Sequence, residues 1–265
     1  MTRSVELPVV REVRRPAPPD PATPNPVIPI PVAPNFDRLA LPYRWLELLT
    51  FGPLLQRMRL HFLEQLGNCR RALVLGDGDG RFTAALLDRW PQLHVHAIDA
   101  SPTMLRILSQ NSRAHRARLT TEVSDLRCWA PQAEGRYDLI VTHFFLDCLS
   151  TDEVASLARR VGPAAEADAL WVVSDFAVPE TRFGRWLAGP LVRGLYLAFH
   201  ILTGLVIRRL PDHAAELRST GWQLQSTASN LKGLLISQIW RSSNTPRLHD
   251  CATIPSWTQQ KPRHG

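Results

Sequence analysis

The sequence predicts an α/β fold with a mostly parallel sheet of seven strands and helices on both of its faces. Short aliphatic and β-branched runs alternate along the chain with longer stretches of helical periodicity. This alternation is typical of parallel strands joined by crossover helices. The chain has 265 residues, of which 45% are hydrophobic, so it can bury one substantial core. We therefore expect a single α/β domain over residues 36–240.

The expected elements follow in the order that this alternation requires. Strands are predicted at residues 72–75, 93–98, 119–123, 137–142, 170–175, 222–226 and 234–240. Helices are predicted at residues 37–50, 53–66, 80–89, 102–112, 151–161 and 211–219. A pair of strongly apolar helices is predicted across 182–207, so we expect a helical lid at 181–208, inserted after the fifth strand.

Both ends of the chain are predicted to be flexible. Residues 1–35 form a proline-rich arm in which prolines remove backbone donors and prevent regular helix or central strand. Such an arm favours polyproline II and could dock a partner, or it could be a solvated tail. Residues 241–265 receive the same interpretation, as a flexible C-terminal tail.

The net charge of +7 raises the question of a nucleic-acid partner. By count, about +1 falls on residues 1–35 and about +3 on residues 241–265, which leaves about +3 on the body. Arginines and aromatic residues do not interleave in one run, as a groove for single strands requires. The sequence therefore argues against a nucleic-acid substrate.

Cysteine usage and hydropathy favour a cytoplasmic protein. The four cysteines are Cys69, Cys128, Cys148 and Cys251. They lie far apart, without the spacing of a zinc or redox motif and without an apolar leader before them. We expect free thiols and no metal site. The longest apolar run, residues 195–207, is shorter than the roughly 20 residues that span a bilayer, so no transmembrane segment is predicted.

A glycine turn follows the first predicted strand. Gly76, Gly78 and Gly80 stand between an apolar run and the next helix. Glycine is needed where a Cβ would block the approach of a ligand or the dihedral angles of the turn. A dinucleotide fingerprint would place its third glycine at position 81, where Arg81 stands. An ordinary strand-to-helix loop is the other alternative.

A carboxylate ends the second predicted strand, about 20 residues past the glycines. Asp99 could accept hydrogen bonds from both hydroxyls of a ribose. Its alternative role is to cap the helix that begins at Pro102, although Ser101 is better placed for that. Because the glycine turn precedes it, we favour the ribose role for Asp99.

Together the turn and this carboxylate resemble motif I and the following strand of class I S-adenosylmethionine-dependent methyltransferases. The resemblance implies a Rossmann-like sheet, S-adenosyl-L-methionine as cofactor, a small-molecule methyl acceptor and no metal. The cofactor-binding residues that it implies are Gly76, Asp77, Gly78, Gly80, Asp99, Ala100, Ser101, Ser124, Asp125, Leu126, Thr142 and His143. Asp125 matches the acidic residue beside the adenine amino group in that family, and its alternative is a solvated turn.

Upstream, residues 36–43 resemble the N-terminal helix of the ubiquinone and menaquinone C-methyltransferase group. In that group the tyrosine matching Tyr43 closes over the cofactor. Arg44 stands where the group usually has aspartate, so a quinone substrate is not implied. The resemblance covers residues 36–240.

The fourth predicted strand ends in Thr142-His143-Phe144-Phe145, which resembles motif IV of the family. His143 has the imidazole suited to a base that takes a proton from a hydroxyl or an activated carbon. Its alternative role is an ordinary hydrogen bond in the cleft. Members that methylate amines often carry Asn-Pro-Pro-aromatic here, so the sequence favours O- or C-methylation.

The apolar lid predicts a hydrophobic or aromatic acceptor. It could wall a pocket above Phe144 and Phe145, with His143 or His200 as polar anchors. Alternatively the lid is plain core, or its flanking arginines rest on an anionic membrane surface and collect a lipid-like substrate.

Three further functions stay open. An aminopropyltransferase would need extra carboxylates at the end of the fourth strand, where only Asp147 is near in sequence. A non-catalytic, partner-regulating protein that binds S-adenosylmethionine and a nucleic-acid methyltransferase are the other two.

Overall fold

In a computed structural model of the chain, the structure describes residues 53–131, 137–179 and 210–243. The strands are β1 (Arg71–Leu75), β2 (His94–Asp99), β3 (Leu119–Val123), β4 (Tyr137–His143), β5 (Ala165–Phe176), β6 (Trp222–Asn230) and β7 (Leu235–Ser242). The α-helices are α2 (Pro53–Leu60), α3 (Arg81–Arg89), α4 (Pro102–Asn111), α5 (Thr151–Val161) and α7 (His213–Ser219). The predicted helices at 37–50 and 182–207, the lid and most of both arms lie outside the described residues.

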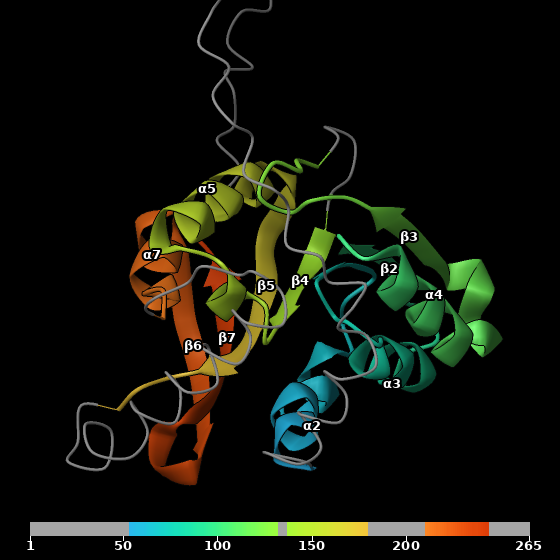
Figure 1. Cartoon of the computed structure of the whole chain (residues 1–265), viewed down its shortest axis with the longest axis horizontal. Coiled ribbons are helices and arrows are strands. Elements are labelled where there is room, and N and C mark those ends of the chain that lie inside the picture. The colour runs from blue at the N-terminus through green and yellow to red at the C-terminus, as the bar shows by residue number, and fades with distance from the viewer. Residues whose placement is uncertain (1–52, 132–136, 180–209, 244–265) are drawn as a thin grey trace, which may run out of the picture. The chain divides into compact units, whose positions relative to one another are not determined.

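The strands form one sheet in the order β3-β2-β1-β4-β5-β7-β6 (Figure 1). Strands β1 to β5 run parallel to one another, whereas β7 runs antiparallel to both β5 and β6. The predicted α/β class with a mostly parallel, seven-stranded sheet is confirmed. Within the described ranges, no helix combines the length and the apolarity needed to cross a membrane.

Three strands extend two or more residues beyond the bounds that the sequence pattern predicts. β5 begins at Ala165, and β6 continues to Asn230 because it pairs with β7 up to Leu235. β6 lies at the edge of the sheet and most of its side chains are exposed, so it carries no apolar signature. β7 likewise continues to Ser242, inside the segment that the sequence assigns to the C-terminal tail.

The helix predicted at residues 53–66 is divided in two. α2 ends at Leu60, and a short 3₁₀ turn, η2 (Leu63–Leu66), follows. The division lets the two halves reach different parts of the core. Leu55 belongs to a cluster with Phe144 after β4 and Phe176 at the end of β5, whereas Leu66 belongs to the cluster formed with β1 and α3.

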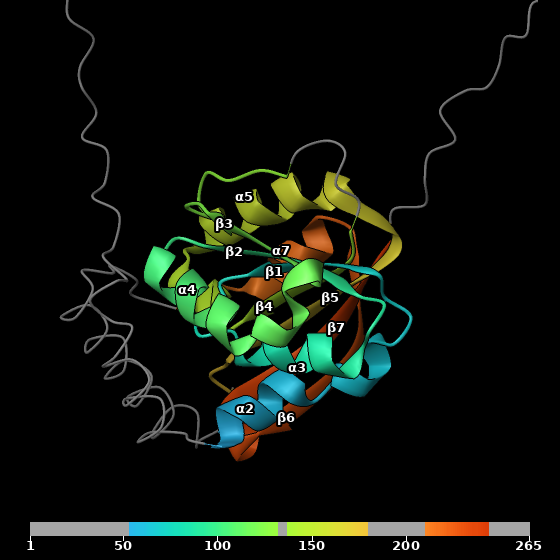
Figure 2. The ribbon, with the colours of Figure 1, turned by 90° about the vertical axis from the view of Figure 1, so that its right-hand side faces the viewer.

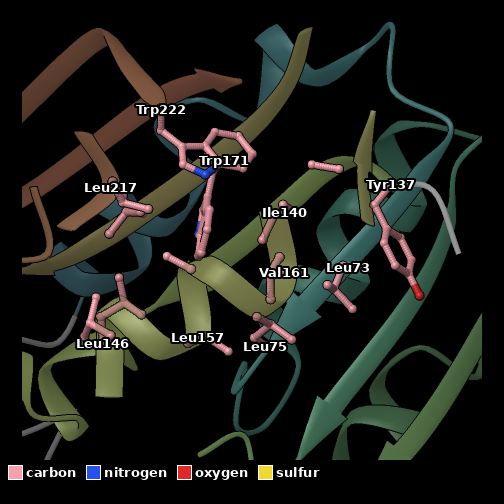
Figure 3. Packing of buried hydrophobic residues seen from close by; sticks show 14 of the residues in the cluster. Leu73, Leu75, Tyr137, Ile140, Leu146, Leu157, Val161, Trp171, Leu217 and Trp222 are labelled. Atoms are coloured by element: carbon pink, nitrogen blue, oxygen red, sulfur yellow. The ribbon is translucent and has the colours of Figure 1, made fainter. Parts of the chain in front are cut away.

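Helices cover both faces of the sheet (Figure 2). Alternate residues of β1 point to opposite faces, so that Leu73 packs on the side of α5 and α7 while Val74 packs on the side of α3 and α4. This two-sided burial explains the nearly continuous apolar runs of the central strands. Figure 3 shows the first of these clusters, where Trp171 and Trp222 meet edge to face with ring centroids 5.1 Å apart.

Replacing Trp171 with alanine should lower the free energy of unfolding by about 3–5 kcal/mol, because a large side chain leaves a cavity in the packed cluster. Its indole Nε1 also donates to the Thr142 hydroxyl at 3.0 Å, and that hydroxyl would lose its partner. Urea denaturation measures the change. The control is Leu224→Ala, because Leu224 is 38% exposed on β6 and should cost less than about 1 kcal/mol. Equal losses would contradict the packing described for this cluster.

Candidate active site

The strand order reverses between β1 and β4. The chain passes from β1 to β2 and β3 on one side, and β4 and β5 extend the sheet on the other side. In open α/β sheets, ligands bind at the carboxyl ends of the strands beside such a reversal. Leu75 of β1 is in register with Thr142 of β4, so Gly76 follows one strand where His143 ends the other.

All three glycines of the turn have positive φ angles, as the sequence predicts for residues that need glycine: +67° at Gly76, +60° at Gly78 and +74° at Gly80. A Cβ at Gly76 would lie 2.5 Å from Cδ2 of Phe145, and one at Gly80 would lie 2.4 Å from Cγ of Leu108. A Cβ at Gly78 would meet no atom of the described residues within 4 Å. The turn is therefore packed at both ends and open at Gly78. Helix α3 starts at Arg81, with Gly80 as its N-cap rather than its first residue.

Asp77 turns into the protein at the first turn of α3. Its Oδ2 accepts the backbone N–H of Thr83 at 2.9 Å and the Thr83 hydroxyl at 2.7 Å. Its Oδ1 is buried and has no hydrogen-bond partner in the described part of the chain. Burial raises the pKa of Asp77 to about 6, although the Thr83 bonds and the charge of Arg59 act in the opposite direction. The Asp77 side chain thus links the glycine turn to the first turn of α3 through its hydrogen bonds with Thr83.

Asp99 lies at the end of β2 and is hydrogen-bonded to two other predicted site residues, Ser101 and Ser124. Its Oδ1 accepts the N–H of Ser101 at 2.8 Å, and its carbonyl oxygen accepts the N–H of Ser124 at 3.1 Å. The cap of α4 is Ser101, whose hydroxyl accepts the N–H of Met104. Asp99 therefore does not cap the helix. Ala100, between the two, is exposed.

The segment after β3 is held by two arginines. The Arg127 guanidinium donates hydrogen bonds to both oxygens of the Asp125 carboxylate, with Nη2 at 2.6 Å from Oδ2 and Nε at 3.0 Å from Oδ1. This hydrogen bonding lowers the pKa of Asp125, so the residue stays ionised. Arg160 of α5 donates to the carbonyl of Leu126 at 2.7 Å, and the Leu126 side chain packs in the core. Because its side chain is buried, Leu126 could contact a ligand only through backbone atoms.

Thr142 and His143 point to opposite faces of β4. The Thr142 hydroxyl accepts the indole of Trp171 in the core. His143 lies against Phe82 of α3, with ring centroids 4.4 Å apart, and neither ring nitrogen has a hydrogen-bond partner among the described residues. Burial lowers the pKa of His143 well below its ordinary value, and the charge of Arg59 lowers it further. The imidazole is therefore neutral at physiological pH and keeps a nitrogen lone pair.

The Cys148 thiol donates to Oδ1 of Asp147 at 3.5 Å. Burial raises the pKa of Cys148 well above its ordinary value, and the charges of Asp147, Asp175 and Asp99 raise it further. The backbone N–H of Asp147 donates to Oδ2 of Asp175 at 3.1 Å. Burial raises the pKa of Asp175 well above its ordinary value, and the charge of Asp147 raises it further. Asp175 was missed in the sequence, although, like Asp99, it is a carboxylate near the end of a buried strand.

An apolar cluster lies on the α2 side of the loop after β4. Phe144, with φ of +52°, donates its N–H to the Ser174 carbonyl at 2.7 Å. Its ring meets Phe176 with centroids 5.4 Å apart. The cluster consists of Leu55, Met58, Phe144, Phe176, Leu234 and Leu235.

Arg59 of α2 stacks on Phe144, its Cζ 5.0 Å from the ring centroid. The sequence signal for Arg59 is its i+4 spacing from Leu55 on the apolar side of a helix.

Some predicted parts of the site lie outside the described residues. These include Tyr43, His200 and the whole lid, so the closure of Tyr43 over the cofactor, the lid above the acceptor pocket and its contact with a membrane surface stay predictions.

Comparison with known proteins supports the class that this geometry indicates. Residues 72–164 match the protein family described as "Methyltransferase domain". A trans-aconitate 2-methyltransferase from Azoarcus sp. is 27% identical over 196 residues, which span 73% of this chain and 68% of that relative. The solved structure of an O-methyltransferase family protein from Burkholderia thailandensis superposes with a TM-score of 0.59 at 18% identity. It covers 79% of this chain, which spans 64% of the length of that structure.

An N-methyltransferase from Bradyrhizobium japonicum, solved with S-adenosyl-L-homocysteine, has a TM-score of 0.50 at 15% identity and covers 71% of this chain and 84% of its own. The fold, the glycine turn and these matches define the class: the chain is an S-adenosylmethionine-dependent methyltransferase, and S-adenosylmethionine is its cofactor. Within this class, the curated relatives that span about 70% of the chain are trans-aconitate 2-methyltransferases. The ubiquinone and menaquinone C-methyltransferases that residues 36–43 resemble are not among them.

Gly78→Ala and Gly80→Ala should separate ligand binding from folding. Alanine in the left-handed region costs about 1–2 kcal/mol at either position. At Gly80 the clash with Leu108 adds overpacking, for a total of about 2–5 kcal/mol of unfolding free energy. At Gly78 the methyl group enters the open space, so the main loss should be in affinity for S-adenosylhomocysteine. Urea denaturation and calorimetry measure the two effects. A Gly78→Ala variant with unchanged affinity would show that no ligand approaches the turn there.

Asp99→Ala should weaken the binding of S-adenosylhomocysteine by about 1.5–3 kcal/mol, because a charged hydrogen-bond acceptor is lost. Asp138→Ala is the matched control. Its carboxylate also accepts backbone N–H groups, from Arg70 at 2.6 Å and Arg71 at 2.9 Å, but at the opposite end of β1. Titration calorimetry on both variants gives the comparison. If both variants bound as tightly as the parent protein, Asp99 would have no place in the cofactor site.

Proposed function

We propose that this enzyme transfers the methyl group of S-adenosylmethionine to an oxygen or carbon atom of a small, largely apolar acceptor, with His143 as the base. The observation that carries the proposal is the position of His143, a buried neutral imidazole without hydrogen-bond partners, next in sequence to Phe144 of the apolar cluster. An acceptor that enters here meets aromatic and aliphatic side chains around one available polar group.

The described residues fit S-adenosylmethionine. The backbone at Gly78 faces open space, and Asp99 and Asp125 are carboxylates after neighbouring strands. In the proposed site, Asp99 would hold the ribose hydroxyls and the segment from Ser124 to Leu126 would hold the adenine. When bound, the cofactor supplies an electrophilic methyl group on a sulfonium.

The protein's own contribution is to orient the acceptor and to receive a proton. In-line displacement needs the nucleophile close to the methyl group and aligned with the bond that breaks. His143 accepts the proton of the acceptor at a ring nitrogen and later releases it to solvent. Apolar walls around the acceptor exclude water from the sulfonium, which supports methyl transfer over hydrolysis.

The charges near the site argue against carrying over the acceptor named for the relatives. Trans-aconitate is a polycarboxylic acid, and the negative charges of Asp99, at the end of β2, and Asp147, after β4, both act on the Cys148 thiol. A polyanion placed beside them would be repelled in a region of low dielectric constant. We therefore propose a neutral acceptor, such as a phenol or an enol with an apolar body.

An acceptor panel tests this proposal. A fused-ring phenol should be methylated with a kcat/KM at least about tenfold above that of trans-aconitate, because the pocket contacts favour apolar surface. Release of S-adenosylhomocysteine and mass spectrometry of the product measure the reaction. Phe176→Ser should raise the KM for the phenol, whereas the exposed-site variant Leu224→Ser should leave it unchanged. A preference for trans-aconitate would overturn the proposed acceptor class.

A further inference from the structure

One buried hydroxyl connects helix α2 to the sheet. Ser174 of β5 and Ser237 of β7 are both fully buried. The Ser174 hydroxyl donates to the backbone carbonyl of Met58 at 3.2 Å, and it lies 2.9 Å from the Ser237 hydroxyl. A hydroxyl carries a single proton, so when Ser174 donates to Met58 it accepts from Ser237. The direct bond to α2 is therefore made by Ser174, and Ser237 supports it from behind.

The bond is made where α2 needs one. Met58 lies in the last turn of the helix, which ends at Leu60, and carbonyls in a last turn have no partner within the helix. The Met58 carbonyl accepts the Ser174 hydroxyl and the N–H of His61, the latter at 3.3 Å. A helix of eight residues is not stable in isolation, so the position of α2 depends on such contacts with the sheet.

Small residues allow α2 to approach the sheet. Ser174 is in register with His143 of β4 on one side and with Ser237 on the other, and Ser237 is in register with Ala228 of β6. Residues in register on neighbouring strands point to the same face. The short side chains at 174, 237 and 228 leave room for the backbone of a helix on the face that also holds His143. α2 lies beside α3 on this face (Figure 1).

The backbone of the same serine holds the turn that follows His143. The Ser174 carbonyl accepts the N–H of Phe144 at 2.7 Å. Phe144 has a φ of +52°, which a bulky residue rarely adopts and which persists only where surrounding contacts fix it. Its ring contacts Phe176, and Arg59 of α2 stacks on it. Ser174 thus contacts α2 through its hydroxyl and the turn after β4 through its carbonyl.

We propose that Ser174 is a positioning residue that sets the spacing between α2 and the turn after His143, and thereby the fit of the acceptor. Leu55 and Met58 of α2 belong to the same apolar cluster as Phe144 of the turn. Apolar contacts form only when atoms approach within about 4.0–4.5 Å, so a ligand between these two walls gains or loses contacts as their spacing changes. The inference rests on the proposed function, which places the acceptor at this cluster.

The test compares Ser174→Ala with the matched control Ser237→Ala. Each removes one fully buried serine hydroxyl, but Ser237→Ala leaves the bond from Ser174 to Met58 in place. In the ligand-free protein, hydrogen exchange at the amides of α2, followed by mass spectrometry, should be at least about fivefold faster in Ser174→Ala, because the end of the helix loses its bond to the sheet. In Ser237→Ala it should stay close to the parent rate.

Naphthol, a fused-ring phenol, is the probe for the pocket. With S-adenosylhomocysteine bound, titration calorimetry should show about fivefold weaker naphthol binding in Ser174→Ala, because the two walls are no longer held in place before the ligand binds. Ser237→Ala should bind naphthol as the parent protein does, and S-adenosylhomocysteine should bind all three proteins equally. In turnover, the KM for naphthol should rise in Ser174→Ala while the KM for S-adenosylmethionine does not move. A loss of general stability would not separate the two substrates in this way.

The outcomes distinguish this inference from the proposed function. A folded Ser174→Ala protein with the parent's naphthol affinity would overturn the positioning role, whether or not exchange in α2 is faster. Equal losses in Ser174→Ala and Ser237→Ala would overturn it too, because the bond to Met58 would not be their cause. Naphthol binding that depends on Ser174 without any methyl transfer would support the inference and overturn the proposed function. A parent protein that does not bind naphthol would overturn both.

A second variant keeps the test decisive if Ser174→Ala does not fold. Ser174→Cys retains a side chain of similar size whose S–H is a weaker donor. It should show the same changes in exchange and in naphthol affinity, each smaller than fivefold but above those of Ser237→Cys, by about twofold or more. Equal values for the two cysteine variants would overturn the role of Ser174.

Discussion

Two glycines that leave no room for a side chain fix the arrangement of the site. A Cβ at Gly76 would overlap the ring of Phe145, and one at Gly80 would overlap Leu108 of α4. Close packing at these two points holds the turn after β1 against the loop after β4 and against the helix after β2. The backbone between them is left open at Gly78, which is where a nucleoside-bearing cofactor can approach it.

Buried ionisable groups near the strand ends have different electrostatic surroundings. On the side of α3, the cation of Arg59 acts on Asp77 and on His143. Around Cys148, on the other side of the strand ends, Asp147 and Asp175 repel one another, and burial raises the pKa of Asp175. Isolated charges in a protein interior are costly unless they are paired or neutralised. We infer that the site keeps its polar groups for the cofactor and the proton, and offers apolar walls to the acceptor.

The comparisons define the class of enzyme more firmly than they define its acceptor. A shared fold places the cofactor at the reversal of strand order, whereas the acceptor is bound by loops and insertions that vary between relatives. At 27% identity to a trans-aconitate 2-methyltransferase, such acceptor-binding segments can differ completely.

The sequence by itself determined the features that depend on neighbouring residues: the central strands, the glycine turn, and Ser101 rather than Asp99 as the cap of α4. These follow from local sterics, short hydrogen bonds and apolar periodicity, which a sequence displays directly. Only the tertiary structure decided that the Asp77 carboxylate turns inward and that Arg59 stacks on Phe144. The direction in which such a side chain points depends on the register and packing of segments that are far apart in the chain.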